Sequence, residues 1–169
     1  GAVLATEEAA SGMTAGTHGS TYGGNPLACA VGCAVMDIVA EPAFLDTVNA
    51  RAGFLRQKLE GLIAAHPDVF EGVRGMGLML GLKCKVAPID VVKAGYECGV
   101  ITVPAADNVV RLLPPLNISE EEISEAVNRL DFAADAVREA HRPDDCVSVK
   151  HKLVSRARLL NFASTRPPA

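Results

Sequence analysis

The sequence predicts a mixed α/β fold in which helices alternate with a small sheet, and three observations support it. Apolar residues recur at helical spacing over residues 44–63. Short aliphatic runs flank a glycine-rich turn at residues 75–77 and recur at 100–113. Ser119, with Glu122 three residues later, is a capping box that opens a last helix. The order from residue 43 is helix, strand pair, helix, strands, helix, which is typical of a compact α+β layer.

The composition is that of a globular protein and excludes several function classes. The 169 residues are 49% hydrophobic and 21% charged, which suits one domain or a piece of a larger one. Aromatic residues make up only 4% and Trp is absent, so stacking platforms for nucleic acid are not expected. No apolar run approaches the roughly 18 residues of a membrane span, and no signal peptide is visible. We therefore expect a cytoplasmic protein with no membrane and no nucleic-acid partner.

Charge divides the chain in two. Residues 1–136 hold 9 basic and 17 acidic side chains, a net charge of -8, whereas residues 137–169 hold 7 basic and 3 acidic ones, a net charge of +4. The last stretch has a basic cluster at 150–158 and ends in Arg-Pro-Pro-Ala. We interpret residues 137–169 as a loosely tethered basic extension of unknown structure.

The N-terminal 40 residues predict one short strand and one helix. Residues 2–6 are apolar enough for a short buried strand, and we expect the chain to begin within a fold because the strand follows Gly1 directly. Asn25 and Pro26 then mark a helix start, with Asn as the N-cap and Pro at the first helical position. The apolar pattern carries this helix through Val39.

The elements that follow are bounded by proline and glycine. His66-Pro67 ends the long helix, and strands are expected at 69–74 and 78–83. Pro88 opens another helix, which Gly99 closes. Two further strands are expected at 100–103 and 109–113.

The segment from His18 to Pro26 places hydroxyls and flexible backbone immediately before a helix N-terminus. Such a place attracts phosphate, because unpaired amides and the helix dipole favour an anion and the Ser and Thr hydroxyls of Ser20 and Thr21 donate further hydrogen bonds. An equally good interpretation is a capped turn whose glycines merely relieve strain. The segment is not a Walker loop, since no Gly-Lys-Ser/Thr follows.

Arg111 interrupts the apolar strand at 109–113. An unpaired charge is costly to bury, so its guanidinium either reaches water or binds an anion, and its planar fork suits a carboxylate. The spacing alone favours the solvent-reaching alternative. Arg74 raises the same question, but its place beside a turn favours a surface or packing role.

No catalytic residue stands out. The histidines lack an adjacent acid and nucleophile, and the five cysteines are scattered with no CxxC pair, so no metal site is expected. Glu120, Glu121 and Glu122 lie in the first turn of a predicted helix, where they complement its dipole. Any chemistry must therefore be supplied by a group from elsewhere.

Residues 16–28, Gly-Thr-His-Gly-Ser-Thr-Tyr-Gly-Gly-Asn-Pro-Leu-Ala, carry a family resemblance. Together with residues 1–6, 73–79 and 111–118 they resemble the class III, ornithine-type aminotransferases, most closely the acetylornithine branch. The resemblance covers roughly residues 1–130. It implies the C-terminal part of a fold-type I transferase that uses pyridoxal 5'-phosphate (PLP). Residues 1–40 would end the large cofactor-binding domain with its connecting helix, and residues 41–136 would form the small α+β domain.

The resemblance also implies roles for three residues. Thr21 would bind the cofactor phosphate in the active site of the neighbouring subunit of a homodimer. Ser20 would contact the acetylornithine substrate, and Arg111 would receive the α-carboxylate of the reacting amino acid. The substrates would be amino acids and 2-oxo acids, namely N-acetylornithine and 2-oxoglutarate in arginine biosynthesis.

The sequence departs from the family in one essential respect. The Lys that forms the Schiff base with the cofactor would lie upstream of Gly1, and Lys58, Lys83, Lys85 and Lys93 have no matching context. We therefore expect the chain to be inactive alone. Two alternatives stay open: a fragment of an ornithine or 4-aminobutyrate aminotransferase, and a non-catalytic remnant that binds a partner subunit.

Overall fold

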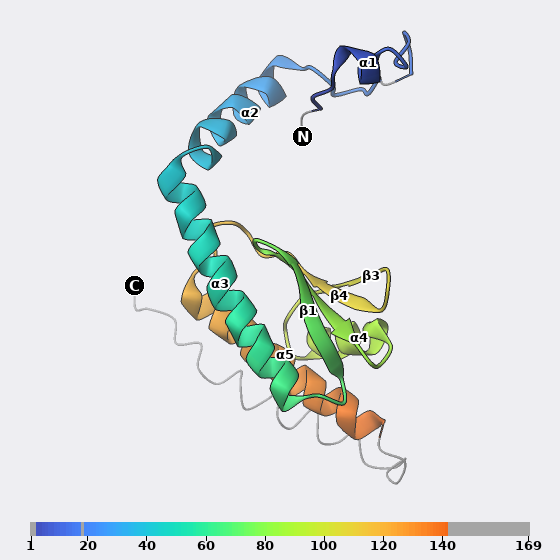
Figure 1. The fold of residues 1–169 in the computed structure, drawn as a ribbon, viewed down its shortest axis with the longest axis vertical. Coiled ribbons are helices and arrows are strands. Elements are labelled where there is room, and N and C mark those ends of the chain that lie inside the picture. Colours follow the sequence, from blue (N-terminus) through green and yellow to red (C-terminus); the bar gives the residue numbers. More distant parts are fainter. Residues whose placement is uncertain (1–2, 18, 142–169) are drawn as a thin grey trace, which may run out of the picture. The chain divides into compact units, whose positions relative to one another are not determined.

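The computed structural model describes residues 3–17 and 19–141, which fall into two compact units divided between Asp46 and Thr47 (Figure 1). The first unit contains α1 (Glu7–Ala10) and α2 (Pro26–Val39). The division falls within α3 (Pro42–Ala65), most of which belongs to the second unit.

The expected strand near the start of the chain is wrong for the residues that the structure describes. Residues 3–6 form no strand, and the side chain of Leu4 is 97% exposed. A strand is stable only when a neighbour accepts and donates its backbone hydrogen bonds, and no described strand lies beside this segment. Thr6 instead caps α1 by accepting a hydrogen bond from the amide of Ala9.

Helix α2 begins where the sequence predicts. The Oδ1 of Asn25 accepts a hydrogen bond from the amide of Ala28 at 2.8 Å, and Pro26 occupies the first turn. None of its residues is buried, although Leu27, Met36 and Ile38 are large and apolar. A helix that is apolar on all sides is normally covered, so α2 offers a large apolar surface for contact. Among the described residues no single helix is long and apolar enough to cross a membrane, and α2 and α3 would do so only as a bent pair.

The second unit has the predicted order of elements. After α3 come β1 (Phe70–Met76), β2 (Met79–Cys84), α4 (Pro88–Glu97), β3 (Val103–Ala105), β4 (Val109–Leu112) and α5 (Glu120–Ala140). The four strands form one antiparallel sheet in the order β1-β2-β4-β3. The capping box at the start of α5 is confirmed, because Ser119 and Glu122 exchange both hydrogen bonds.

Several strand boundaries differ from expectation by one or two residues, and two larger differences concern the third strand and the last helix. The strand expected at 100–103 begins only at Val103, because the amide of Val100 bonds to the carbonyl of Gly95 at 2.9 Å and so belongs to the end of α4. Gly99, at φ +78°, closes that helix as predicted. Helix α5 continues to Ala140 and so includes the first four residues of the expected basic extension, of which it buries Val137. The rest of that extension, residues 142–169, lies outside the described residues.

The core of the second unit is mostly aliphatic, as the low aromatic content predicts, with Phe70 as an aromatic exception. Its strands contribute Phe70, Leu80, Leu82, Val110 and Leu112, and its helices contribute residues such as Leu55, Leu59, Val91, Ile123 and Leu130. Helices α3 and α5 run in the same direction, side by side (Figure 1). Arg51 pairs with Glu120 at 2.8 Å near their starts, and the buried His66 bonds through Nε2 to Asp131 at 2.7 Å further along.

The opposite face of the sheet carries a group of basic residues beside the apolar Val109, which stands opposite Lys83. Arg74, Gly81 and Arg111 stand directly opposite one another on β1, β2 and β4, so they share one face. Lys83 lies two residues along β2 and points to the same side. We call the face that carries these four residues the open face.

Candidate functional site

The hydroxyl-bearing turn at residues 20–25 is attached rigidly to the start of α2. The amide of Gly23 donates to the carbonyl of Ser20 at 3.2 Å, and Asn25 bonds to the carbonyl of Tyr22 through both its amide and its side chain. Gly24 adopts φ +73°, a conformation that favours glycine. A Cβ on Gly23 would lie 2.8 Å from Ser20 Oγ, so glycine also provides the space there.

The side chains of Ser20 and Thr21 are exposed, and neither hydroxyl has a hydrogen bond among the described residues. The helix terminus itself offers little more, because Pro26 has no N–H and Asn25 occupies the amide of Ala28. The amide of Leu27 is the first one left for an outside acceptor. An anion at this turn would therefore be bound mainly by the hydroxyls of Ser20 and Thr21. The amides of the helix start contribute less than the sequence predicts.

Arg111 lies on β4 with Gly81 opposite it on β2 and Val103 opposite it on β3. Its side chain is exposed and makes no hydrogen bond or ion pair with the described residues. The structure thus places it in solvent, as the solvent-reaching alternative requires. The same placement leaves its planar fork available to a carboxylate.

Arg74 has a different environment on the same face. Its Nη1 pairs with Asp107 Oδ2 at 2.6 Å, and Lys83 Nζ pairs with Asp107 Oδ1 at 3.1 Å. The hydrogen bonds from Arg74 and then Lys83 hold the pKa of the Asp107 carboxyl below its usual range. The surface role expected for Arg74 is consistent with this pair.

Asp107 and its neighbour Asn108 are the residues that sequence reasoning missed. They form the turn between β3 and β4, and both have positive φ, 64° and 56°. Asp and Asn tolerate this conformation better than other side-chain-bearing residues, so an Asp-Asn pair between two expected strands was the signal for a tight turn.

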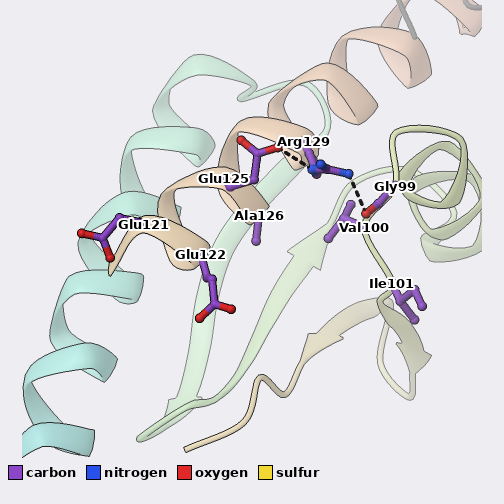
Figure 2. A pocket seen from close by; sticks show the side chains of 8 residues that line it. All are labelled: Gly99, Val100, Ile101, Glu121, Glu122, Glu125, Ala126 and Arg129. Carbon is purple, nitrogen blue, oxygen red and sulfur yellow. Dashed lines mark hydrogen bonds and ion pairs between the residues drawn. The ribbon is translucent and has the colours of Figure 1, made fainter. Parts of the chain in front are cut away.

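A shallow depression of about 560 Å³ lies beside the start of α5 (Figure 2). Glu121, Glu122, Glu125 and Arg129 line it, with Val100 among the apolar residues at its base. Glu122 belongs to the capping box, and Arg129 bonds to Glu125 and to the carbonyl of Gly99. These contacts end α4 and begin α5, and the capping role that the sequence predicts for Glu122 is confirmed.

Three of the lysines, Lys58, Lys83 and Lys85, have contacts within the described residues. Lys58 lies over the ring of Phe54, and Lys85 donates to the carbonyl of Pro67 at 2.7 Å. Residues 1–46 contain neither Lys nor Arg. Over residues 3–17 and 19–141 there is also no group of three His, Cys, Asp or Glu residues that could hold a metal ion.

Residues 1–133 match the family model described as aminotransferase class-III. The chain therefore belongs to the class III aminotransferases, and the predicted fold class, that of the fold-type I transferases, is confirmed. The match runs through both the turn at residues 20–25 and Arg111.

Among curated proteins, the acetylornithine aminotransferase of Rhodobacter capsulatus is 69% identical over 134 residues, which are 79% of this chain and 34% of that enzyme. The chain thus spans about a third of the length of the curated relatives it matches. The crystal structure of acetylornithine aminotransferase from Elizabethkingia anophelis is 32% identical with a TM-score of 0.63, over 78% of this chain and 34% of that one. A Toxoplasma gondii ornithine aminotransferase, described with partial occupancy of PLP at its active site, is 32% identical with a TM-score of 0.64, over 75% of this chain and 31% of that one.

Proposed function

We propose that the chain is the C-terminal part of an acetylornithine aminotransferase, which exchanges an amino group between N-acetylornithine and 2-oxoglutarate in arginine biosynthesis. The observation that carries the proposal is the 69% identity to the Rhodobacter capsulatus enzyme, together with a family match that includes both predicted site segments. The cytoplasmic location expected from the sequence forms part of this proposal.

The turn at residues 20–25 fits the phosphate end of PLP. Thr21 presents an exposed hydroxyl on a turn whose shape is fixed by Asn25 and two glycines, and a hydroxyl is a good donor to a phosphate oxygen. Ser20, beside it, would contact the acyl-bearing substrate. PLP, when bound, supplies the electron sink for the carbon chemistry. Thr21 and Ser20 would only bind and orient.

Arg111 fits the α-carboxylate of the amino acid. It is exposed, it lacks a partner among the described residues, and its position on a strand of a packed sheet fixes its direction of approach. A guanidinium binds a carboxylate through two parallel hydrogen bonds, which also fixes the orientation of the ligand. Its role would be to seat the substrate.

Two features support an incomplete active site in this chain. The lysine that would hold the cofactor has no counterpart in residues 1–46, which contain no Lys. Helix α2 is apolar on all sides and buries none of its residues in its own unit. Both features fit a chain that needs the rest of the enzyme and a second subunit, and that is inactive alone. Thr21 would then bind cofactor in the neighbouring active site of a homodimer.

A chimera tests the proposal. Residues 1–133 would replace the matching third of the Rhodobacter capsulatus enzyme, which supplies the missing part. We expect the chimera to transaminate N-acetylornithine with 2-oxoglutarate and to bind PLP, while the 169-residue chain does neither. A folded, dimeric chimera without activity would favour the non-catalytic remnant, and a preference for ornithine or 4-aminobutyrate would favour the other branches.

Two variants of the chimera test the residue roles. Thr21→Val removes a hydrogen bond to phosphate worth about 1.5–3 kcal/mol, so the dissociation constant of PLP should rise about 10- to 150-fold. Thr17→Val is the matched control, because Thr17 bonds to the carbonyl of Thr14 within the chain. Unchanged PLP affinity in Thr21→Val would remove this residue from the site.

For Arg111→Ala, the Michaelis constant for glutamate should rise by a similar factor, since a charged hydrogen-bond partner is lost. Arg138→Ala is the control, because Arg138 pairs with Asp135 on α5 and lies outside the open face. An unaltered Michaelis constant in Arg111→Ala would favour the solvent-reaching alternative.

A further inference from the structure

The open face gathers three cations, and one of them has no partner within residues 3–17 and 19–141. Arg74 and Arg111 flank Gly81 in the same row of the sheet, and Lys83 lies two residues away on the central strand. Arg74 and Lys83 both pair with Asp107, whereas Arg111 has no partner among the described residues. Asp107 thus determines which cations of the open face are paired: Arg74 and Lys83 are, and Arg111 is not paired with it.

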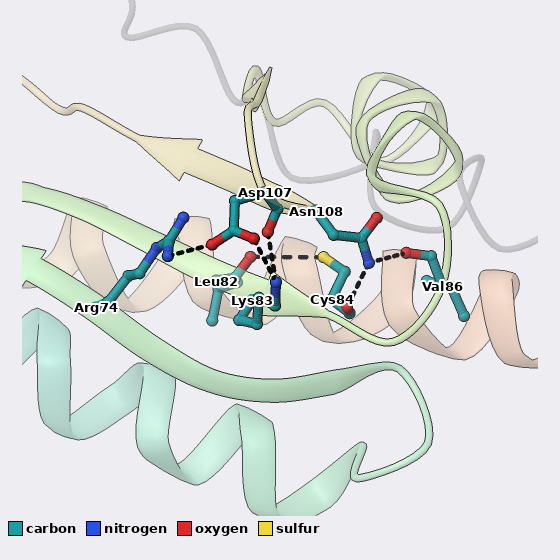
Figure 3. Close-up of polar contacts among 7 residues, drawn as sticks. All are labelled: Arg74, Leu82, Lys83, Cys84, Val86, Asp107 and Asn108. Atoms are coloured by element: carbon teal, nitrogen blue, oxygen red, sulfur yellow. Dashed lines mark hydrogen bonds and ion pairs between the residues drawn. The ribbon is translucent and has the colours of Figure 1, made fainter.

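The path of the Arg74 side chain explains how this pairing is reached. Asp107 lies in the turn between β3 and β4, and β2 lies between β1 and β4 in the sheet. The Arg74 side chain, which starts from β1, must therefore extend across β2 to reach Asp107 (Figure 3). A Cβ on Gly81 would lie 3.9 Å from Arg74 Cγ and 2.6 Å from Val109 Cγ1. The space above Gly81 is therefore filled by the side chain of Val109, so only glycine fits there, and the Arg74 side chain passes at ordinary van der Waals distance.

The turn that carries Asp107 is fixed by its neighbour. Asn108 donates through Nδ2 to the carbonyls of Cys84 and Val86, and its own carbonyl accepts from the amide of Cys84 at 2.8 Å (Figure 3). The carbonyl of Asp107 accepts a further hydrogen bond from Lys83 Nζ at 2.6 Å. These hydrogen bonds hold the Asp107 carboxylate at one position over the open face.

We propose that Asp107 is a specificity-determining residue: by holding Arg74 and Lys83, it leaves Arg111 as the one cation of the open face that receives a carboxylate. The inference rests on the role proposed for Arg111. Arg74 and Arg111 are two strands apart, about 10 Å between backbones, so two long side chains released there can grip both ends of one dicarboxylate. Glutamate and 2-oxoglutarate are dicarboxylates, and Asp107 excludes that competing mode of binding for them.

The test uses the 169-residue chain with its arginine Nε groups labelled with ¹⁵N, and it follows their NMR shifts during titration with butyrate or glutarate. In the native chain both probes should move the Arg111 signal and leave Arg74 in place. In Asp107→Asn, glutarate should also move the Arg74 signal, and its affinity relative to butyrate should rise about two- to fivefold, the range of an exposed ion pair. Asn keeps the turn, because it tolerates positive φ.

Two further variants isolate the effect. Asp90→Asn removes the same charge from α4 and should leave the glutarate-to-butyrate ratio unchanged. Adding both Arg74→Gln and Lys83→Gln to Asp107→Asn should restore the native ratio, because both cations that Asp107 held are then gone. The inference is overturned if Arg74 responds to glutarate in the native chain, or if the ratio in Asp107→Asn equals the native one.

The outcome also separates the two proposals. If neither probe moves the Arg111 signal in the native chain, the role proposed for Arg111 fails, and the inference falls with it. If Arg111 responds normally but Asp107→Asn has native selectivity, only the inference about Asp107 is overturned.

Discussion

Replacing Gly75 with alanine should be among the most damaging small changes in this chain. Gly75 lies in β1 at φ +120°, a conformation that side-chain-bearing residues rarely adopt. A Cβ there would lie 2.1 Å from the carbonyl oxygen of Met79 and 3.1 Å from the Cα of Leu80. Both neighbours are backbone atoms, so the clash is relieved only if the end of the hairpin opens.

The size of the effect follows from what is lost. The strained backbone costs about 1–3 kcal/mol. Opening the hairpin also weakens the pairing of Gly75 with Leu80 and the 2.8 Å hydrogen bond from Arg56 to the Gly75 carbonyl, each worth about 1 kcal/mol. We expect Gly75→Ala to lower the free energy of unfolding by about 3–5 kcal/mol, a large share of the stability of an ordinary domain.

Urea unfolding followed by circular dichroism measures this loss, and two other glycines are matched controls. Gly77→Ala should cost only about 1–2 kcal/mol, because φ is +56° but the space is open. Gly53→Ala should stabilise α3 by up to about 1 kcal/mol, because nothing lies within 4 Å and φ is ordinary. A Gly75→Ala chain no less stable than Gly77→Ala would refute the reasoning.

Three further predictions concern stability. Leu59→Ala should cost about 2–5 kcal/mol in urea unfolding, because the Leu59 side chain is fully buried; a loss under 1 kcal/mol would mean that the core collapses around it. Ser119→Ala should cost about 1 kcal/mol, while Ser119→Asp, which keeps an acceptor for the amide of Glu122, should cost less; equal losses would discount the cap. Burial raises the pKa of the Cys84 thiol from 9.0 to about 11. The folded chain thus keeps this proton longer than the unfolded chain, so stability should fall as pH rises from about 9 to 11, and Cys84→Ala should remove that part of the slope.

Local rules were sufficient wherever an element carries its own boundary signals. Asn25-Pro26, Ser119 with Glu122, and Gly99 each satisfy backbone groups within a few residues, so the starts of α2 and α5 and the end of α4 could be predicted without any tertiary contact. The family resemblance around residues 16–28 was likewise local, and it gave the fold class that the family match confirms.

Pairing between distant segments decided where the strands form. The strand expected at residues 2–6 is absent because nothing described lies beside it, and the strand expected at 100–103 moved to Val103–Ala105 because the end of α4 uses Val100 first. Composition indicates strand propensity, but a strand exists only where a neighbour completes its hydrogen bonds.

The candidate site shows the same division. The sequence by itself determined that Arg111 lies on a strand and that Ser20 and Thr21 lie at a helix start. Only the tertiary structure decided that Asp107 holds Arg74 and Lys83, while Arg111 meets no partner in the described part of the chain. Ion pairs between strands depend on register and on the path of long side chains, and both are set by packing of segments 30 or so residues apart, beyond the reach of local pattern.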